Sequence, residues 1–348
     1  MSTDVSETTA ALGRSRARRL PTARGPLSRI VLELLNSAEV AADDHRVDIP
    51  ALDDVDPYGD DLQLALAVCY ELHYVGFVDV DGRWEWHPGL LAVRAALERH
   101  FLAALRRDVP QSGPSDTAAA EMDELSYFSP DGDGGSYHLR DVGTWDQFRQ
   151  MFALRSIYHL KEADPHAWAI PRLRGQSKAA FVAVEFDEFG GGRGAAVHQE
   201  LFADLLLAAD LSADYLGYLD EVPAVALTPV NLMSFFGLHR RHRGAAVGHL
   251  AATEITSSPG SQRLLAGLER LDAPAACRHF YAEHVEADAV HEQILRTDVV
   301  GDLVRTEPDL ELDVIFGIRA FLFVEDALER HVLSAWRRGD SAIPAARL

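Results

Sequence analysis

Apolar residues recur at three- and four-residue intervals along almost the whole chain after Gly143, and the alternation typical of β-strands is hardly visible. This spacing places apolar side chains on one face of each helix, and those faces must be buried against one another. No internal repeat at a fixed period and no strand-helix-strand rhythm accompanies it. The pattern predicts an all-α bundle with helices over 144–163, 175–189, 195–209, 213–221, 224–240, 243–257, 260–270, 273–299 and 308–337.

A smaller helical part is predicted before this bundle. Helical spacing with a proline or an aspartate near the start is found over 27–35, 57–75 and 88–107. We therefore expect an N-terminal helical subdomain over 26–107 and the bundle over 144–340.

The remaining segments are predicted to be irregular. Residues 108–143 contain three prolines and the run Asp131–Gly135, and are interpreted as a solvated linker. A calcium loop starting at Asp131 is not favoured, because its twelfth position holds Val142 in place of glutamate. Residues 1–25 are predicted to be a disordered basic tail.

Charge and cysteine content exclude several classes of partner and site. The chain has 54 Asp and Glu against 33 Lys and Arg, a net charge of −21 at pH 7. Such a surface repels phosphate backbones and anionic lipids, so neither nucleic acid nor a membrane is an expected partner. Only Cys69 and Cys277 are present, which indicates a reducing compartment without structural disulfides. Any metal must therefore bind to His, Asp and Glu.

No segment indicates export or membrane insertion. Arg18-Arg19 is followed by Leu20-Pro21 and further polar residues, so it does not begin a secretory or twin-arginine signal. The longest uncharged stretch, Val222–Leu238, contains two prolines and is interpreted as a buried core helix. The expected location is the cytoplasm.

The first candidate metal ligands lie within the predicted helix 273–299. At 100° per residue, Asp288 and His291 lie at about 40° and about −20° from His284, so all three share one narrow face. Two imidazoles and a carboxylate therefore converge over two turns. The alternative is a solvated face on which these side chains only bind each other, and this face alone cannot complete a metal site.

A second pair of candidates flanks a glycine run. Glu188 ends an apolar helix just before Gly190-Gly191-Gly192, and His198 follows the run. On a straight helix, residues ten apart are about 15 Å from each other, too far to serve two metals that lie about 4 Å apart. Both can be ligands only if the glycines break the helix, which glycine does readily. The alternative is a surface turn with an unrelated histidine.

Two further carboxylates are unusual for a packed bundle. Glu254 lies among small and apolar residues, where an unpaired charge costs several kcal/mol. Glu162 ends a predicted helix just before Asp164-Pro165, and either glutamate could be an ordinary helix-end residue. Together with the residues above, they give three histidines and four carboxylates, the ligand chemistry of a non-haem diiron or dimanganese centre.

From about 144 to 336 the chain resembles the haem-oxygenase-like diiron oxidases and oxygenases, often labelled iron-containing redox enzymes. The segments that carry the resemblance are Lys161–His166, Asp187–His198, Gly237–Glu254 and Glu283–His291, with a weaker similarity at Cys69–Tyr74. The resemblance implies a haem-oxygenase-like helical bundle whose metal ligands are Glu188, His198, Glu254, His284, Asp288 and His291. Glu162 corresponds to an additional carboxylate in the branch that resembles N-oxygenases, and is both a metal ligand and the expected catalytic residue.

The resemblance also implies a function. Two Fe(II) ions with O2 as co-substrate would oxidise a small molecule, and N-oxygenation of an amine or guanidine is favoured. The appended β-barrel domains of some N-oxygenases are not seen, so their substrate does not carry over. Oxidative C–C cleavage, desaturation or decarboxylation at the same site is the first alternative, and a non-catalytic metal-binding module is the second. An external electron donor and a homodimer are compatible with this prediction.

Other histidines are weaker candidates. A haem oxygenase would need a proximal histidine on an early helix, and His73 is better interpreted as a core or surface residue. A group of basic residues is interpreted as the polar face of a helix whose arginines could steer an anionic substrate: His239, Arg240, Arg241, His242, Arg243 and His249.

Overall fold

The computed structural model describes residues 18–37, 47–113, 115–127, 129 and 131–343. Every named secondary-structure element in these ranges is helical, and the all-α prediction is confirmed. The α-helices are α1 (Pro26–Leu35), α2 (Asp60–Glu71), α3 (Pro88–Asp108), α4 (Ala118–Leu125), α5 (Gly135–Asp141), α6 (Trp145–His159), α7 (Asp164–Ala167), α8 (Gly175–Glu188), α9 (His198–Ala208), α10 (Ala224–Leu238), α11 (Arg243–Arg270), α12 (Ala275–Ile294), α13 (Asp302–Thr306) and α14 (Glu311–Arg338).

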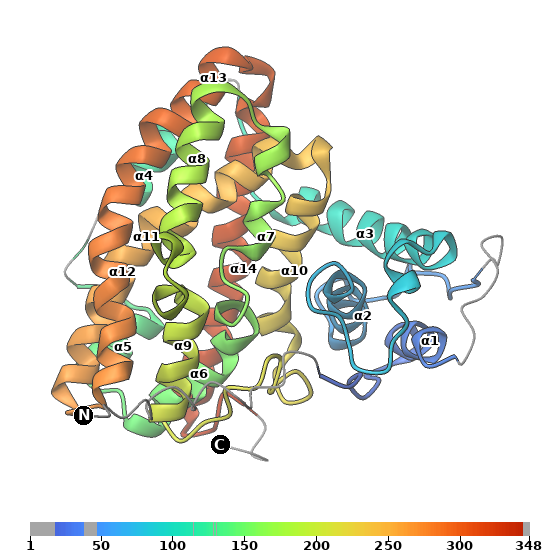
Figure 1. Cartoon of the computed structure of the whole chain (residues 1–348), viewed down its shortest axis with the longest axis horizontal. Coiled ribbons are helices and arrows are strands. Elements are labelled where there is room, and N and C mark those ends of the chain that lie inside the picture. The colour runs from blue at the N-terminus through green and yellow to red at the C-terminus, as the bar shows by residue number, and fades with distance from the viewer. Residues whose placement is uncertain (1–17, 38–46, 114, 128, 130, 344–348) are drawn as a thin grey trace, which may run out of the picture.

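The long helix α11 is the axis of the bundle, and it packs along both α12 and α14 (Figure 1). Glycines allow the closest approach between α11 and α14. A Cβ added at Gly248 would clash with the carbonyl of Val314, and one at Gly317 would clash with the carbonyl of Ala245. The two backbones are therefore in direct contact, which fixes the α11 face that is left for α12 and the candidate site.

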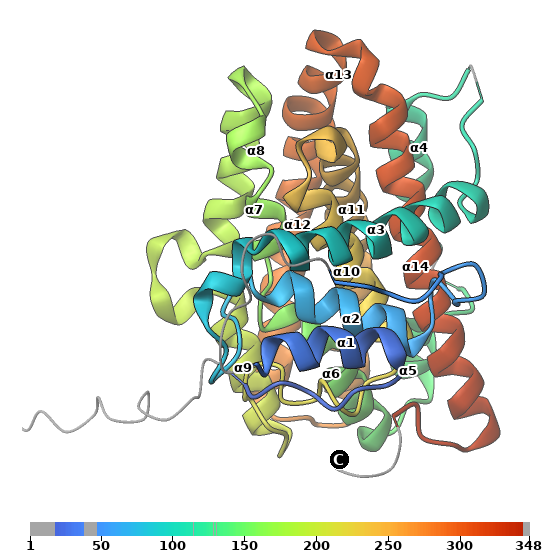
Figure 2. The ribbon, with the colours of Figure 1, turned by 90° about the vertical axis from the view of Figure 1, so that its right-hand side faces the viewer.

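The N-terminal helices α1, α2 and α3 lie side by side and cross one face of the bundle (Figure 2). Helix α2 packs against α10, where Asn231 donates hydrogen bonds of 2.8 Å to the carbonyl and the side chain of Gln63. The three predicted helices of this part are present. The division of the chain into domains at 26–107 and 144–340 stays a prediction.

Two predictions of irregular structure are wrong. The segment 108–143 contains α4 and α5, both of which pack against α11 and α14, so it is not a solvated linker. Part of the predicted disordered tail is also ordered. Arg18 donates from Nη1 to the carbonyl of Leu216 and from Nη2 to Asp220, both at 2.5 Å. Residues 1–17 of that prediction lie outside the described residues.

Two helix predictions also need correction. Residues 213–221 form turns, and Leu216 has a left-handed φ of 55° that a helix cannot contain. The predicted break at Pro259 is absent, because α11 continues through this proline. Proline removes one hydrogen bond of the helix, but the packing of α11 along α12 and α14 holds both halves in line.

None of the described helices is both long and apolar enough to cross a membrane.

Candidate metal centre

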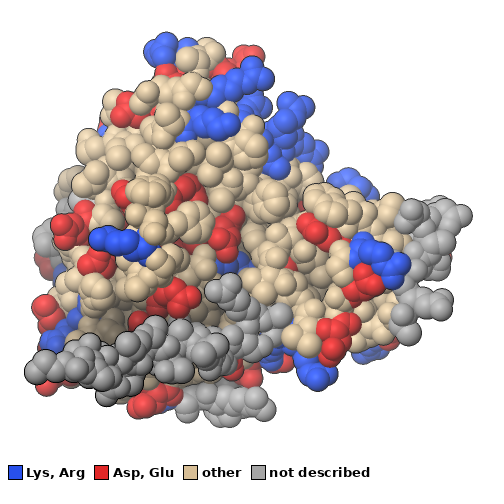
Figure 3. Space-filling model, in the orientation of Figure 1, with Lys and Arg blue, Asp and Glu red and all other residues tan. Residues whose placement is uncertain are grey.

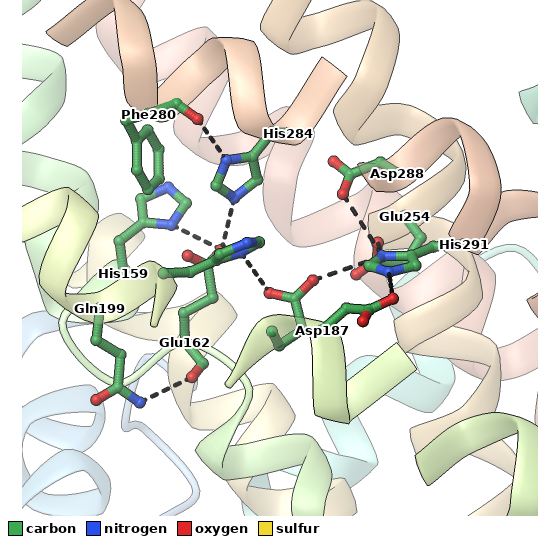
Figure 4. A network of polar contacts seen from close by, with 11 residues as sticks. His159, Glu162, Asp187, Gln199, Glu254, Phe280, His284, Asp288 and His291 are labelled. Atoms are coloured by element: carbon green, nitrogen blue, oxygen red, sulfur yellow. Dashed lines mark hydrogen bonds and ion pairs between the residues drawn. The ribbon is translucent and has the colours of Figure 1, made fainter. Parts of the chain in front are cut away.

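The structure brings all seven sequence-predicted site residues together in two neighbouring groups. The first group is Glu162, His198 and His284, and the second is Glu188, Glu254, Asp288 and His291. Within each group, one ligand atom from every residue lies within 4.8 Å of the others, and all seven side chains are buried. Figure 4 shows the two groups side by side between the helices of the bundle.

Helix α12 supplies ligands to both groups from one face. His284 belongs to the first group, while Asp288 and His291, one and two turns later, belong to the second. His291 Nδ1 lies 3.0 Å from Glu254 Oε2 and 3.7 Å from Asp288 Oδ1. The other ring nitrogen of His291 lies 3.4 Å from the half-exposed Asp187, a contact that orients the imidazole and was not predicted from the sequence.

Glu188 lies between the two groups. Its Oε2 is 2.7 Å from His198 Nδ1 in the first group, and its Oε1 is 3.5 Å from His291 Nδ1 in the second. This position depends on the glycine run. Helix α8 ends at Glu188, Gly190, Gly191 and Gly192 have left-handed φ values of 69°, 59° and 80°, and α9 starts at His198. The helix break expected from the sequence is present, and it brings the two side chains into contact.

Glu162 lies in a turn and not at a helix end. Helix α6 ends at His159, and the chain then turns through Ala163, whose left-handed φ is 72°. His159 Nδ1 donates to Glu162 Oε1 at 2.9 Å, and Gln199 donates to the Glu162 carbonyl at 2.9 Å. His284 Nε2 lies 3.7 Å from the same carboxylate oxygen. Although burial disfavours its charge, His159 and His284 hold the pKa of Glu162 well below its ordinary value.

The polar atoms of the site fit bound cations. Three buried atoms have no hydrogen-bond partner among the described residues: Glu162 Oε2, His284 Nε2 and Asp288 Oδ2. Buried polar atoms are normally hydrogen-bonded, so three unpartnered ones in one place need an explanation. His284 Nδ1 donates to the Phe280 carbonyl at 2.7 Å, which directs Nε2 toward the first group as a potential ligand. Electron-pair donors that lack hydrogen bonds are what metal ligands require.

Without a metal, the crowded carboxylates retain protons in the site. Although burial opposes its charge, Glu162 raises the pKa of His284 to about 10. Glu254 likewise raises the pKa of His291 to about 9 against the effect of burial. Burial, together with the charge of Glu254, raises the pKa of Asp288 well above its ordinary value.

We therefore expect metal binding at pH 7 to release at least about two protons per chain, because neutral imidazoles and ionised carboxylates are the ligand forms. Both histidine pKa values lie above 7, so affinity should increase as the pH rises toward 9 to 10. Titration with Zn(II) in a weak buffer with a pH indicator measures the release. Metal binding without proton release at pH 7 would contradict these protonation states.

The glycine run should be less protected when no metal is bound. The backbone between Glu188 and His198 is irregular, and shared metal coordination would strengthen the contact of 2.7 Å that joins the two side chains. We expect hydrogen exchange across 186–200 to be faster in the metal-free protein than in the iron-loaded protein. Helix α3 is the internal control, since it contributes no residue to the centre. Equally strong protection of 186–200 in both states would disprove the idea.

A cavity of about 410 Å³ adjoins the first group, and Glu162, His159 and His284 form part of its wall. It lies between α6, α10, α11, α12 and α14, and apolar side chains such as Leu154, Met233 and Phe321 make up most of the rest. Helix α11 leaves room for it by presenting small residues: Thr253, Thr256, Ser257, Gly260 and Ser261. The cavity has the size and composition of a small-molecule site.

Two histidines of the basic cluster do not lie where the sequence predicts them. His242 and His249 are buried, so they are not part of a polar helix face. His249 lines the cavity, and its Nδ1 lies 3.1 Å from Nε2 of the buried His166, another residue that had no predicted role. The only signal for this pair was its place within the segments that carry the family resemblance.

The arginines of that cluster lie at the surface, unlike the two buried histidines. Arg240 and Arg243 line a surface groove of about 490 Å³ with Arg172 and Arg174. Basic atoms gather there, near the top of Figure 3. Whether this groove attracts an anionic substrate stays a hypothesis.

His73 is buried and forms contacts with Glu85 and Arg94, as expected of a core residue.

Comparison with known families adds one finding. Residues 149–326 match the model of a family described as iron-containing redox enzyme. The matched segment contains all seven residues of the two groups and most of the helices that line the cavity. No curated protein matches the chain.

Proposed function

The chain belongs to the iron-containing redox enzyme family, and we propose from this premise that it is a non-haem diiron enzyme that uses O2 to oxidise a small molecule. The observation that carries the proposal is the position of Glu188, whose two oxygens face a histidine of each group. A carboxylate between two sets of His and carboxylate ligands is the arrangement that two adjacent metal ions require.

The described residues divide naturally between two ions. Glu162, His198 and His284 would hold one ion, and Glu254, Asp288 and His291 the other, with Glu188 between them. When bound, two Fe(II) ions supply two electrons for the reduction of O2. The cavity reaches only the first group, at Glu162 and His284, so a substrate would approach the ion held there.

We further propose that the substrate is an amine or guanidine that undergoes N-oxygenation. The cavity wall contains four carboxylates, from Glu162, Glu325, Asp326 and Glu329, but only two guanidinium groups, from Arg155 and Arg263. Arg155 and Glu325 neutralise each other through two hydrogen bonds, of 2.9 and 2.6 Å, and Glu162 is assigned to the metal. Asp326 and Glu329 then face the one guanidinium group of Arg263, and this smaller excess of carboxylates favours a cationic substrate over a carboxylic acid.

The reaction requires an external electron donor and protons. Insertion of one oxygen atom of O2 into an N–H bond leaves the other atom to become water, which consumes two electrons and two protons. His159 donates a hydrogen bond to Glu162 and also lines the cavity, so His159 is placed to supply a proton on the substrate side of the centre.

Anaerobic loading with Fe(II) followed by exposure to O2 tests the proposed function. Absorption and Mössbauer spectroscopy should show two Fe(II) ions per chain that both become ferric with coupled spins. Binding of a single iron, or two irons that stay ferrous in O2, would contradict it. Rapid iron oxidation without turnover of any amine, guanidine or carboxylic acid would favour the non-catalytic alternative.

Filling the cavity should prevent turnover without removing the metal. The hydroxyl of Thr256 bonds only to the carbonyls of its own helix, so Thr256→Leu adds volume to the cavity wall without breaking a contact between helices. We expect kcat/KM to fall by about 10-fold or more, with two irons still bound. Thr306→Leu is the matched control, because Thr306 also bonds to its own helix but lines the separate arginine groove and not the cavity. Equal activity of the two variants would place the substrate elsewhere.

A further inference from the structure

Lys161, the residue next to Glu162, connects the turn of the candidate centre to the N-terminal helices. It forms a buried ion pair with Glu71 at the end of α2, and the side chains of both residues are at most 6% exposed. Tyr215 donates to the same carboxylate oxygen at 3.1 Å. The Lys161 ammonium also lies 4.8 Å from the ring centre of Tyr74 and 5.4 Å from that of Tyr215. The ammonium is thus surrounded by partners that fix its position.

The backbone of this turn gives Glu162 little support of its own. Its amide donates to the His159 carbonyl at 3.4 Å, a long hydrogen bond. The next residue, Ala163, has a left-handed φ of 72°, which costs an alanine about 1 kcal/mol or more. The amides on either side make ordinary hydrogen bonds: that of Lys161 donates to the Tyr158 carbonyl at 2.8 Å, and that of Asp164 donates to the Lys161 carbonyl at 3.1 Å. The weak point of the turn is therefore at Glu162 and Ala163, where contacts from outside add support. Lys161 provides a buried ion pair with Glu71, and Gln199 provides a hydrogen bond to the Glu162 carbonyl.

We propose that Glu71 and Lys161 are positioning residues for the first metal-binding group, so that helix α2 holds the turn from which Glu162 reaches its ion. The inference rests on the proposed function, because it assumes that Glu162 is a ligand. On this proposal the N-terminal helices do more than cover one face of the bundle. They hold one ligand of the centre in place through an ion pair between residues 90 positions apart.

The inference predicts a selective effect. Glu162 belongs to the first group only, and the second group is supplied by α8, α11 and α12, none of which contains Lys161. Loss of the ion pair should therefore weaken one of two bound metals and spare the other. A purely structural role of the pair would reduce stability and weaken both metals together.

Three variants and one control separate these outcomes. Lys161→Met and Glu71→Gln each remove one charge, while the double variant leaves no unpaired buried charge and protects the fold. Asn231→Leu is the control, because it breaks another buried contact between α2 and the bundle, in the wall of the same small cavity, and leaves the charges of Glu71 and Lys161 in place. Glu162→Gln is the reference for loss of the ligand itself. Circular dichroism and thermal unfolding monitor the fold of each variant.

The probe is Co(II), titrated anaerobically into the full chain and followed by its visible absorption. We expect two equivalents in the unaltered protein. In the double variant, one equivalent should bind about 10- to 100-fold more weakly, with the same loss of absorption bands as in Glu162→Gln. The Asn231→Leu control should lower the unfolding temperature and retain both equivalents.

Equal weakening of both equivalents, or an unchanged titration in the double variant, would overturn the positioning role while the two-metal centre stands. The same selective loss in Asn231→Leu would also overturn it, because any damage to the α2 contact would then suffice. Fewer than two equivalents in the unaltered protein would instead refute the proposed centre itself, and this inference with it.

Discussion

Protein carrying His291→Ala should contain about one iron per chain after anaerobic reconstitution, where the unaltered protein contains two. His291 is the only imidazole of the second group, and its Nδ1 lies within 3.7 Å of oxygens from Glu188, Glu254 and Asp288. Without it, three buried carboxylates face one another with no neutral ligand among them. Their mutual repulsion and burial make them retain protons, and these protons together with the loss of the nitrogen ligand oppose binding of the second ion.

His279→Ala is the matched control for this experiment. His279 lies on the same helix α12, but its side chain is 56% exposed and pairs only with Glu283. It should retain both irons. His284→Ala should lose the other ion, because His284 belongs to the first group. If His284→Ala and His291→Ala both retain two tightly bound irons, the assignment of ligands to α12 is wrong.

Glu162→Ala should reduce the rate of amine oxidation by a much larger factor than it reduces the iron content. Two residues of the first group, His198 and His284, remain, and the second group is intact, so we expect the second ion to bind normally. Glu162 is the only carboxylate of the first group, which is the group that faces the cavity, so the variant leaves this group with two histidines alone. Product formation from amines or guanidines with a gain of one oxygen should fall by about 100-fold or more.

The product assay should include amines, guanidines, fatty acids and amino acids, with mass spectrometry of each product. Glu329→Gln is a useful control, since Glu329 lines the same cavity but belongs to neither ligand group. It should affect amine binding more than the chemical step. Consumption of carboxylic acids alone, with release of CO2, would replace N-oxygenation by the decarboxylation alternative. Unchanged amine oxidation in Glu162→Ala would remove this residue from the mechanism.

The ligands on α12 were predictable because they depend on local geometry. Spacings of four and three residues place His284, Asp288 and His291 on one face of any α-helix. The break after Glu188 was predictable for a related reason, since three consecutive glycines interrupt a helix at little cost. Sequence reasoning succeeds where the deciding interaction lies within one or two turns.

Contacts between distant segments could not be predicted in the same way. Nothing in the local sequence around Lys161 indicates that Glu71 lies opposite it, because tertiary packing alone brings α2 to this turn. The continuous helix through Pro259 is a similar case, in which packing along α12 and α14 outweighs local propensity. The cavity was also hidden, because a row of Thr, Ser and Gly on α11 resembles an ordinary polar face until neighbouring helices surround it.

The three positions of the glycine run differ in how strictly the loop requires glycine. A Cβ at Gly190 would lie 2.6 Å from the backbone of Ala196 and Val197, so no other residue fits there without moving the chain. At Gly191 and Gly192 the nearest atoms belong to the Phe186 ring, at 3.8 and 3.7 Å, and only the left-handed φ disfavours other residues. Asparagine or aspartate can adopt that φ. Proteins that share this loop are therefore free to vary at the second and third positions, while the clash with Ala196 and Val197 adds to the left-handed φ and keeps glycine at the first.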